Sequence, residues 1–273
     1  MPIIDGLQLA RSLRAELKAQ VEGLSPTPLL AVVLVGDDPE STRYVKLKQK
    51  AAEEIGARCR VHHLPGPSQD EIMELVDNLN RDSEVHGILV QLPLPPGMDQ
   101  DRVINAIDVS KDVDGFGPQN LGLGFLGRQV YTSCAAGAIL CLAEKYIPGS
   151  RPRVLLVGDS LDVIKPLTSL CVGQGYPVTV IPELEVGEDL SQYRLVVLEQ
   201  GEPQSISGTM LASGSLVIDA GFHWRDGKTC GNAVTETFVG SDAPWLLPVP
   251  GGLGPLLITM LMKNLVQAAT ARG

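Results

Sequence analysis

Short apolar runs that end in glycine constrain most strongly what this chain can fold into. Leu29-Leu-Ala-Val-Val-Leu-Val-Gly36 and Val154-Leu-Leu-Val-Gly158 contain no polar residue before the glycine. A strand with one solvated face alternates apolar and polar residues, so a continuous apolar run indicates a strand buried on both faces of a parallel sheet. Such strands need helices on both sides, and the runs therefore predict an α/β fold.

Helical and strand-like segments alternate around these two runs. In the N-terminal half, residue spacing and helix-start signals predict helices over residues 7–21, 69–80 and 101–107, a helix opened by Asp37-Asp38-Pro39, and further strands over 59–64 and 87–92. In the C-terminal half they predict helices over 135–146, 166–173 and 256–271, and further strands over 177–181, 195–198 and 216–219. This second series is typical of a small doubly wound nucleotide-binding domain.

Composition excludes several function classes. The 273 residues include 22 Lys and Arg against 32 Asp and Glu, for a net charge of -10. This balance argues against a nucleic-acid partner and against an anionic membrane surface. No apolar run reaches the roughly 20 residues of a membrane span, and no secretory signal precedes the first helix, so we expect a cytoplasmic protein. Five widely spaced cysteines without a CxxC motif predict reduced thiols and no metal site.

Tyr44 and Lys48 stand one helical turn apart and therefore share a helix face. A solvated helix face explains most such pairs, but an aromatic ring and an amine can also border one pocket. Gln91 ends a buried strand, where ligands bind in open α/β sheets. Asp114 belongs to Asp112-Val-Asp-Gly115, which taken alone is most simply a turn. Together these side chains supply an amine, an amide and a carboxylate for acid–base chemistry.

A glycine- and proline-rich loop precedes the last predicted helix. Pro248-Val-Pro-Gly-Gly-Leu-Gly-Pro255 is too stiff and too rich in glycine for an ordinary helix or strand. Glycine allows backbone to approach a ligand closely, although most loops of this composition are only connectors. The chain thus contains several candidate segments, each with an ordinary structural explanation when taken alone.

Taken together and in order, these segments closely resemble the bifunctional methylenetetrahydrofolate dehydrogenase/methenyltetrahydrofolate cyclohydrolase family. The resemblance runs from end to end and rests on Tyr44-x-x-x-Lys48, Val90-Gln-Leu-Pro-Leu-Pro95, Lys111-Asp-Val-Asp-Gly-Phe116, Val154-Leu-Leu-Val-Gly158 and Pro248-Val-Pro-Gly-Gly-Leu-Gly-Pro255. It implies a folate-binding catalytic domain of residues 1–135 plus 250–273, to which the C-terminal helix returns. It also implies a Rossmann-like nucleotide-binding domain of residues 136–249, the cofactor NADP (with NAD or none as alternatives) and a homodimer.

The resemblance also implies roles for single residues. Tyr44 would stack on the pterin ring, Lys48 would be the catalytic lysine assisted by Gln91, and Asp114 would hold the donor edge of the pterin. A lysine between a cationic substrate and apolar walls should have a lowered pKa, because both surroundings disfavour the ammonium form. Further folate contacts would come from Pro250, Gly251 and Gly252, and cofactor contacts from Gly158, Ser160 and Pro166.

The chain departs from the family mainly on the cofactor side. The family's loop reads approximately Gly-Arg-Ser-x-x-Val-Gly-x-Pro, whereas this chain has Gly158-Asp-Ser-Leu-Asp-Val-Ile-Lys-Pro166. Asp159 would repel a 2'-phosphate, and Ile164 adds a side chain where backbone should approach the pyrophosphate. The family's Ala-Val-Gly-Lys-Pro becomes Glu199-Gln-Gly-Glu-Pro203.

Three functions are consistent with this pattern. The first is a bifunctional enzyme that interconverts 5,10-methylene-, 5,10-methenyl- and 10-formyltetrahydrofolate. The second is a cyclohydrolase with weak or lost dehydrogenase activity, and the third is a folate- or nucleotide-binding regulator without turnover. The complete set of Tyr44, Lys48, Gln91 and Asp114 argues against the regulator, which has little need of the lysine.

Overall fold

The structure is a computed structural model that describes residues 2–115, 117–149, 151–184, 188–225 and 227–271. Phe116, the last residue of one quoted motif, lies outside the described residues. The chain forms two compact units. We call them the three-stranded unit (Arg11–Leu123, Gln129–Cys134 and Ile258–Gly273) and the five-stranded unit (Met1–Ala10, Gly124–Arg128 and Ala135–Leu257). Residues 1–10, 124–128, 135 and 250–257, predicted as part of the first domain, are grouped with the five-stranded unit.

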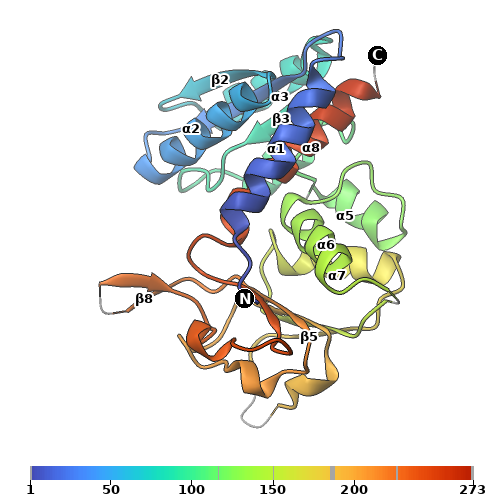
Figure 1. Cartoon of the computed structure of the whole chain (residues 1–273). Coiled ribbons are helices and arrows are strands. Elements are labelled where there is room, and N and C mark those ends of the chain that lie inside the picture. The colour runs from blue at the N-terminus through green and yellow to red at the C-terminus, as the bar shows by residue number, and fades with distance from the viewer. Residues whose placement is uncertain (1, 116, 150, 185–187, 226, 272–273) are drawn as a thin grey trace. The chain divides into compact units, whose positions relative to one another are not determined.

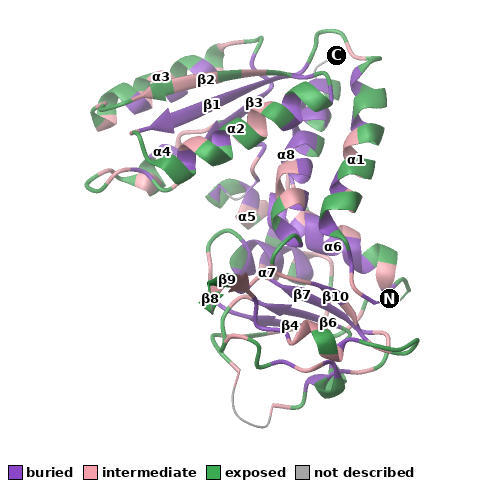
Figure 2. Cartoon of the chain, turned by 60° about the vertical axis from the view of Figure 1, so that its left-hand side comes forward, coloured by how far each residue is buried: buried purple, intermediate pink, exposed green. Residues whose placement is uncertain are grey.

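The three-stranded unit contains a parallel sheet in the order β2-β1-β3 (Figure 1). The strands are β1 (Leu29–Val35), β2 (Arg58–Leu64) and β3 (Gly87–Val90). Every residue of β1 is buried, as the continuous apolar run predicted, and Figure 2 shows the strand in the buried colour along its length. Because β1 is the central strand, its two faces and both its edges are covered.

Helices α1 (Gly6–Val21), α2 (Pro39–Glu54), α3 (Gln69–Arg81) and α4 (Gln100–Asn105) accompany this sheet. Helix α2 begins where Asp38 accepts a hydrogen bond from the Ser41 N–H at 2.7 Å, with Pro39 in the first turn, where its missing N–H does no harm. Helix α3 begins with a capping box between Ser68 and Glu71. Local sequence therefore determines where both helices start.

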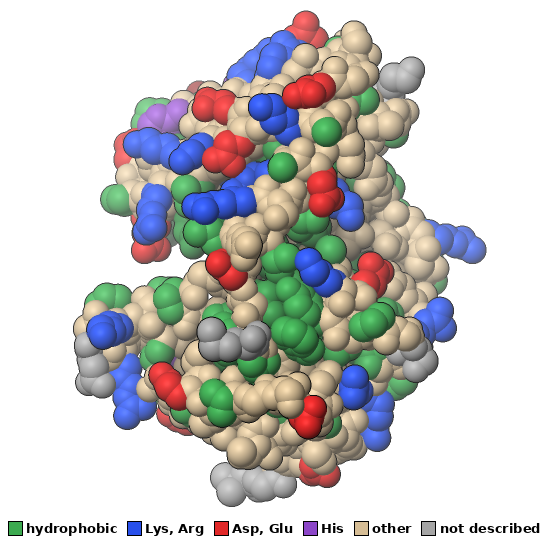
Figure 3. Space-filling view, viewed as in Figure 1, with side chains coloured by type: hydrophobic (Ala, Val, Ile, Leu, Met, Phe, Trp, Pro, Cys, Tyr) green, Lys and Arg blue, Asp and Glu red, His purple; other side chains and the backbone are tan. Residues whose placement is uncertain are grey.

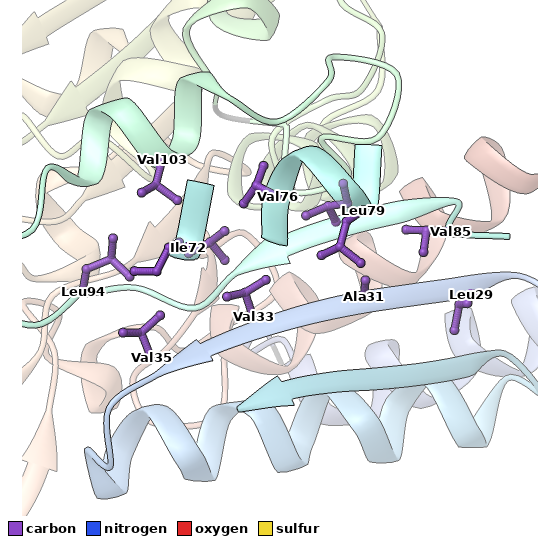
Figure 4. Packing of buried hydrophobic residues seen from close by; sticks show 12 residues of the cluster. Leu29, Ala31, Val33, Val35, Ile72, Val76, Leu79, Val85, Leu94 and Val103 are labelled. Carbon is purple, nitrogen blue, oxygen red and sulfur yellow. The ribbon is translucent and has the colours of Figure 1, made fainter. Parts of the chain in front are cut away.

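The core of this unit lies between the sheet and α3. Figure 4 shows Ala31 and Val33 of β1 on the side that faces Val76 and Leu79 of α3. The alternate residues of β1 point to the other face and are equally buried. Each fully buried aliphatic side chain contributes about 1.5–3 kcal/mol relative to an exposed one. This packing holds the carboxyl ends of β1 and β3 side by side.

The five-stranded unit contains a parallel sheet in the order β10-β7-β6-β4-β5. Its strands are β4 (Val154–Val157), β5 (Val178–Ile181), β6 (Leu195–Leu198), β7 (Leu216–Asp219) and β10 (Trp245–Leu247). The chain places β5 on one side of β4 and then β6 on the other, so the strand order reverses between β4 and β6. Ligands of open α/β sheets bind at such a reversal point.

The other helices in the described part of the chain are α5 (Pro118–Phe125), α6 (Cys134–Tyr146), α7 (Ile164–Gly173) and α8 (Leu253–Thr270). Further short strands are β8 (His223–Arg225) and β9 (Lys228–Cys230). The same part of the chain contains the 3-10 turns η1 (Leu190–Gln192), η2 (Gly208–Met210) and η3 (Thr235–Thr237). The predicted α/β fold with parallel sheets is confirmed. Helix α5, the antiparallel pair of β8 and β9, and β10 were not predicted from the sequence. Helix α8 begins earlier than predicted, because Pro255 is tolerated in a first helical turn.

The five cysteines are unpaired, and Cys134 and Cys171 are buried. No helix in the described part of the chain is long and apolar enough to cross a membrane. On the face shown in Figure 3, acidic and basic side chains are interspersed.

Candidate active site

Lys48 and Gln91, 43 residues apart in the chain, form a direct hydrogen bond in the three-stranded unit. The Lys48 Nζ donates to Gln91 Oε1 at 2.8 Å. Gln91 follows β3 and is buried, and its Nε2 donates to the Leu92 carbonyl at 2.7 Å. The amide group is thereby fixed with its oxygen toward the lysine. The structure thus brings together two of the four predicted catalytic side chains.

The surroundings of Lys48 favour its neutral amine. Burial lowers the pKa of Lys48 below its usual value, and the negative charge of Asp114 opposes this effect. Burial is the larger of the two because it removes water from around the ammonium group. A lowered pKa increases the share of neutral amine at a given pH, and the neutral amine is the form that a general base needs.

Tyr44 lies one turn before Lys48 on α2 and is 52% exposed. Spacing of four residues places both side chains on one helix face. An aromatic ring with half of its surface exposed is able to stack on a flat ligand.

The segment that carries Asp114 is built around a second carboxylate, Asp112. The Asp112 side chain accepts hydrogen bonds from the Asn120 Nδ2 at 2.8 Å, the Gly117 N–H at 3.1 Å and the Gly115 N–H at 3.2 Å. Burial raises the pKa of Asp112, and these three hydrogen bonds oppose the rise. Asp112 therefore organises the turn from within, and the neighbouring Asp114 is only half-buried.

Two further contacts fix the same turn. Asn264 of α8 donates from Nδ2 to the Val113 carbonyl and to the Thr132 carbonyl, both at 2.8 Å. Gly115 has a φ of +74°, and a Cβ there would lie 2.8 Å from backbone atoms of Thr132 and Ser133. The turn predicted from Asp-Gly is real, but its positive φ and its close packing show that glycine is required rather than only favoured.

Cys134 lies beside Asp114, a position that was not predicted from the sequence. Its N–H donates to the Asp114 carbonyl at 3.2 Å. Burial raises the pKa of Cys134 well above its usual value, and the negative charge of Asp114 raises it further. The thiol is therefore neutral, which suits a side chain that packs beside Asp114 and excludes water.

The predicted folate loop, residues 250–252, is grouped with the five-stranded unit, whereas Lys48, Gln91 and Asp114 are grouped with the three-stranded unit. Gly251 has a φ of +87° and is exposed, whereas Gly252 is buried. A Cβ on Gly6, at the start of α1, would lie 2.7 Å from the Gly251 carbonyl oxygen. The loop is thus packed closely against the start of α1, and the contacts of Pro250, Gly251 and Gly252 with a folate stay a prediction.

Of the predicted cofactor residues, Gly158 and Ser160 lie in the loop between β4 and α7, and Pro166 lies in the first turn of α7. Gly158 has a φ of +138°. The Ser160 hydroxyl accepts from the Ile164 N–H at 3.1 Å and from the Val163 N–H at 3.2 Å. The Lys165 N–H donates to the Ser160 carbonyl at 3.0 Å. Ser160 therefore provides the acceptors for the first donors of α7.

This loop does not fit a cofactor phosphate in the arrangement observed. Glu199 follows β6, and its Oε2 accepts a hydrogen bond from the Ser160 N–H at 3.2 Å. A phosphate needs backbone N–H groups at this helix start, and here a carboxylate of the chain itself takes one of them. Asp159 is exposed, and Ile164 is buried with its side chain close to Gly158.

Comparison with known proteins identifies two matching family domains. Residues 4–114 match the family described as tetrahydrofolate dehydrogenase/cyclohydrolase, catalytic domain. Residues 132–273 match the family described as tetrahydrofolate dehydrogenase/cyclohydrolase, NAD(P)-binding domain. Together the two matches include Lys48, Gln91 and Asp114 in the first domain and the Gly158–Pro166 loop in the second.

Proteins of known name and structure agree with these matches. The chain is 42% identical to Bifunctional protein FolD 1 of Syntrophomonas wolfei, over 98% of this chain and 99% of that protein. It is similar to the crystal structure of the bifunctional enzyme FolD from Campylobacter jejuni, with a TM-score of 0.88, 34% identity and 99% of each chain covered. The FolD of Trypanosoma brucei, solved with NADP cofactor and inhibitor, has a TM-score of 0.85 at 27% identity, with 98% of this chain and 97% of that chain covered.

Proposed function

Because the chain belongs to the tetrahydrofolate dehydrogenase/cyclohydrolase family, we propose that it interconverts 5,10-methylene-, 5,10-methenyl- and 10-formyltetrahydrofolate. The relatives are bifunctional enzymes, which favours this function over a cyclohydrolase alone and over a regulator without turnover. The observation that supports the hydrolytic half best is the hydrogen bond between Lys48 and Gln91 beside Asp114.

The hydrolytic half needs a base near the one-carbon bridge. Water attacks the methenyl carbon, which is bonded to both N5 and N10 of the cationic substrate. Neutral Lys48 takes a proton from this water as the new C–O bond forms, and Gln91 holds the amine in position. The C–N5 bond then breaks while the hydroxyl oxygen loses its proton to solvent and becomes the formyl carbonyl. The Lys48 ammonium returns its proton to N5, and the formyl group stays on N10. A positive substrate lowers the pKa of Lys48 further, because two positive charges repel each other.

Two other side chains would bind the substrate. Tyr44 is exposed enough to stack on the pterin ring, and one face of α2 carries it together with Lys48. The Asp114 carboxylate would accept two parallel hydrogen bonds from the donor edge of the pterin. The turn that carries Asp114 is fixed by Asp112 and Asn264, so this carboxylate is positioned before substrate binds.

The dehydrogenase half would use NADP in the five-stranded unit. Support for this comes from the NAD(P)-binding domain match over residues 132–273 and from the NADP in the Trypanosoma brucei structure. The proposal also includes a homodimer in the cytoplasm. Sedimentation equilibrium of the full chain tests the dimer, and a mass of one chain at micromolar concentration would contradict it.

Replacement of Lys48 by Met tests the hydrolytic mechanism. We expect methenyltetrahydrofolate hydrolysis, followed by its loss of absorbance, to fall by about 10²–10⁴-fold, because general base catalysis contributes this much. Lys46→Met is the matched control, since Lys46 is exposed on the same helix and its loss changes the charge equally. Full turnover by Lys48→Met, corrected for spontaneous hydrolysis, would show that another group is the base.

A further inference from the structure

Glu199 stands at the place in the five-stranded unit where a dinucleotide would bind. It directly follows β6, and Gly158 directly follows β4, the neighbouring strand across the point where the strand order reverses. Phosphate-bearing ligands of doubly wound folds bind at this point, against the loop after the first strand and the start of the next helix. In this chain the loop is Gly158–Val163 and the helix is α7.

The chain's own side chains fill the space above the loop glycine. In a dinucleotide loop, glycine leaves room for backbone to approach the pyrophosphate. Here a Cβ on Gly158 would come into collision with the Glu199 carboxylate, and it would lie 3.1 Å from Ile164 Cγ1. Glu199 is half-buried and Ile164 is 1% exposed. The side chains of Glu199 and Ile164 therefore occupy the space that Gly158 would otherwise leave open.

Three backbone N–H donors of the loop and the start of α7 have acceptors in the chain itself. The Ser160 N–H donates to Glu199, and the Val163 and Ile164 N–H groups donate to the Ser160 hydroxyl. Pro166, in the first turn of α7, has no N–H. A carboxylate resembles a phosphate in its charge and in its acceptor oxygens, so Glu199 satisfies the Ser160 N–H as a phosphate would.

We propose that Glu199 is a specificity-determining residue that occupies the phosphate subsite of the dinucleotide site and lowers the affinity of this chain for NADP and NAD. The inference rests on the proposed function, since it concerns the cofactor site of that reaction. A cofactor phosphate must displace the Glu199 carboxylate from Ser160 and must tolerate its charge. The apparent dissociation constant rises in inverse proportion to the fraction of molecules in which the subsite is open.

The test is a comparison of dissociation constants for NADP+ and NAD+, measured by calorimetric titration of the full chain and of three variants. Glu199→Ala removes the carboxylate, and Glu199→Gln removes only its charge while it keeps the size of the side chain. Glu202→Gln is the matched control, because Glu202 is exposed and lies three residues further along. We expect both Glu199 variants to bind NADP+ at least tenfold more tightly than the unaltered chain, and Glu202→Gln to bind within twofold of it.

Equal affinities of the unaltered chain and both Glu199 variants, with unfolding curves that show the variants to be folded, would overturn the proposal. If Glu199→Ala does not fold, Glu199→Gln decides alone. Tighter binding by Glu202→Gln as well would overturn it too, since net charge rather than the subsite would then be responsible. Methenyltetrahydrofolate hydrolysis by the unaltered chain is assayed separately, so that a failure of the proposed function is distinguished from a failure of this inference.

Discussion

Polar side chains near the predicted sites make different kinds of hydrogen bond in the two units. In the three-stranded unit, Asp112 and Asn264 use their hydrogen bonds to hold a turn, and Asp114 beside them is half-buried. In the five-stranded unit, the carboxylate of Glu199 bonds to the very N–H that a ligand would need. The first arrangement fixes the backbone turn that carries Asp114, whereas the second bonds a loop N–H to a side chain of the same unit. The comparison teaches that a loop can keep its family's glycine and serine while a carboxylate of the chain itself takes one of the loop's N–H groups.

The largest expected effect concerns the glycine that shapes the Asp114 turn. Gly115→Ala should lower the free energy of unfolding by about 3 kcal/mol or more, because a positive φ and a collision with backbone at residues 132 and 133 act together. Gly97→Ala is the control, since Gly97 has a φ of +89° but open space around it, and should lower it by only about 1 kcal/mol. Urea unfolding measures both, and equal losses would show that the Asp114 turn is not tightly packed.

Loss of the Asn264 amide should have a smaller effect on the same turn. Asn264→Leu leaves the Val113 and Thr132 carbonyls without this donor, so we expect a loss of about 2 kcal/mol of stability and a raised KM for methenyltetrahydrofolate. Gln267→Leu, on the same helix but exposed, should change stability by no more than about 0.5 kcal/mol. An unchanged KM in Asn264→Leu would mean that the turn does not position substrate.

A double-mutant cycle probes the filled space in the five-stranded unit. Gly158→Ala should destabilise the chain, and by about 1 kcal/mol less when Glu199→Ala is present, because the added Cβ then no longer meets the carboxylate. Chemical denaturation of the unaltered chain, the two single variants and the double variant gives the coupling free energy between residues 158 and 199. Additive losses would show that Glu199 does not stay over Gly158 in solution.

The smallest expected effect is the contribution of Lys48 to the pH dependence of the free energy of unfolding. Its pKa is lowered in the folded state, so between this lowered value and the usual value of 10.5 the unfolded chain binds more protons. Stability due to this group therefore rises as pH rises through that window, and below it the burial penalty is present in full. Lys48→Met should be at least as stable as the unaltered chain at pH 7, and its advantage should shrink at pH 9.5. Parallel stability curves for the two proteins would contradict the lowered pKa.

Much of the fold was predictable from local patterns. The strand predicted from the apolar run of β1 and the helix predicted over residues 69–80 were both found where they were expected. The signals for both act within a few residues, and the structure adds that a capping box starts α3. The short strands β8, β9 and β10, of three residues each, contain too few positions for a periodic pattern to show. Helix α5 was missed because it includes Pro118, Gly122 and Gly124, which are poor helix formers that tertiary packing overrides.

The sequence by itself determined the α/β class, the starts of α2 and α3, and the presence of Tyr44 and Lys48 on one helix face, because neighbouring residues decide these features. Only the tertiary structure placed Lys48 against Gln91, Asn264 against the Asp114 turn, and Glu199 against Ser160. These partners are 43, 151 and 39 residues apart, and backbone geometry of the folded sheets decides which side chains meet over such distances. The sequence identified Glu199 as a departure from its family, and the fold showed which N–H group it takes.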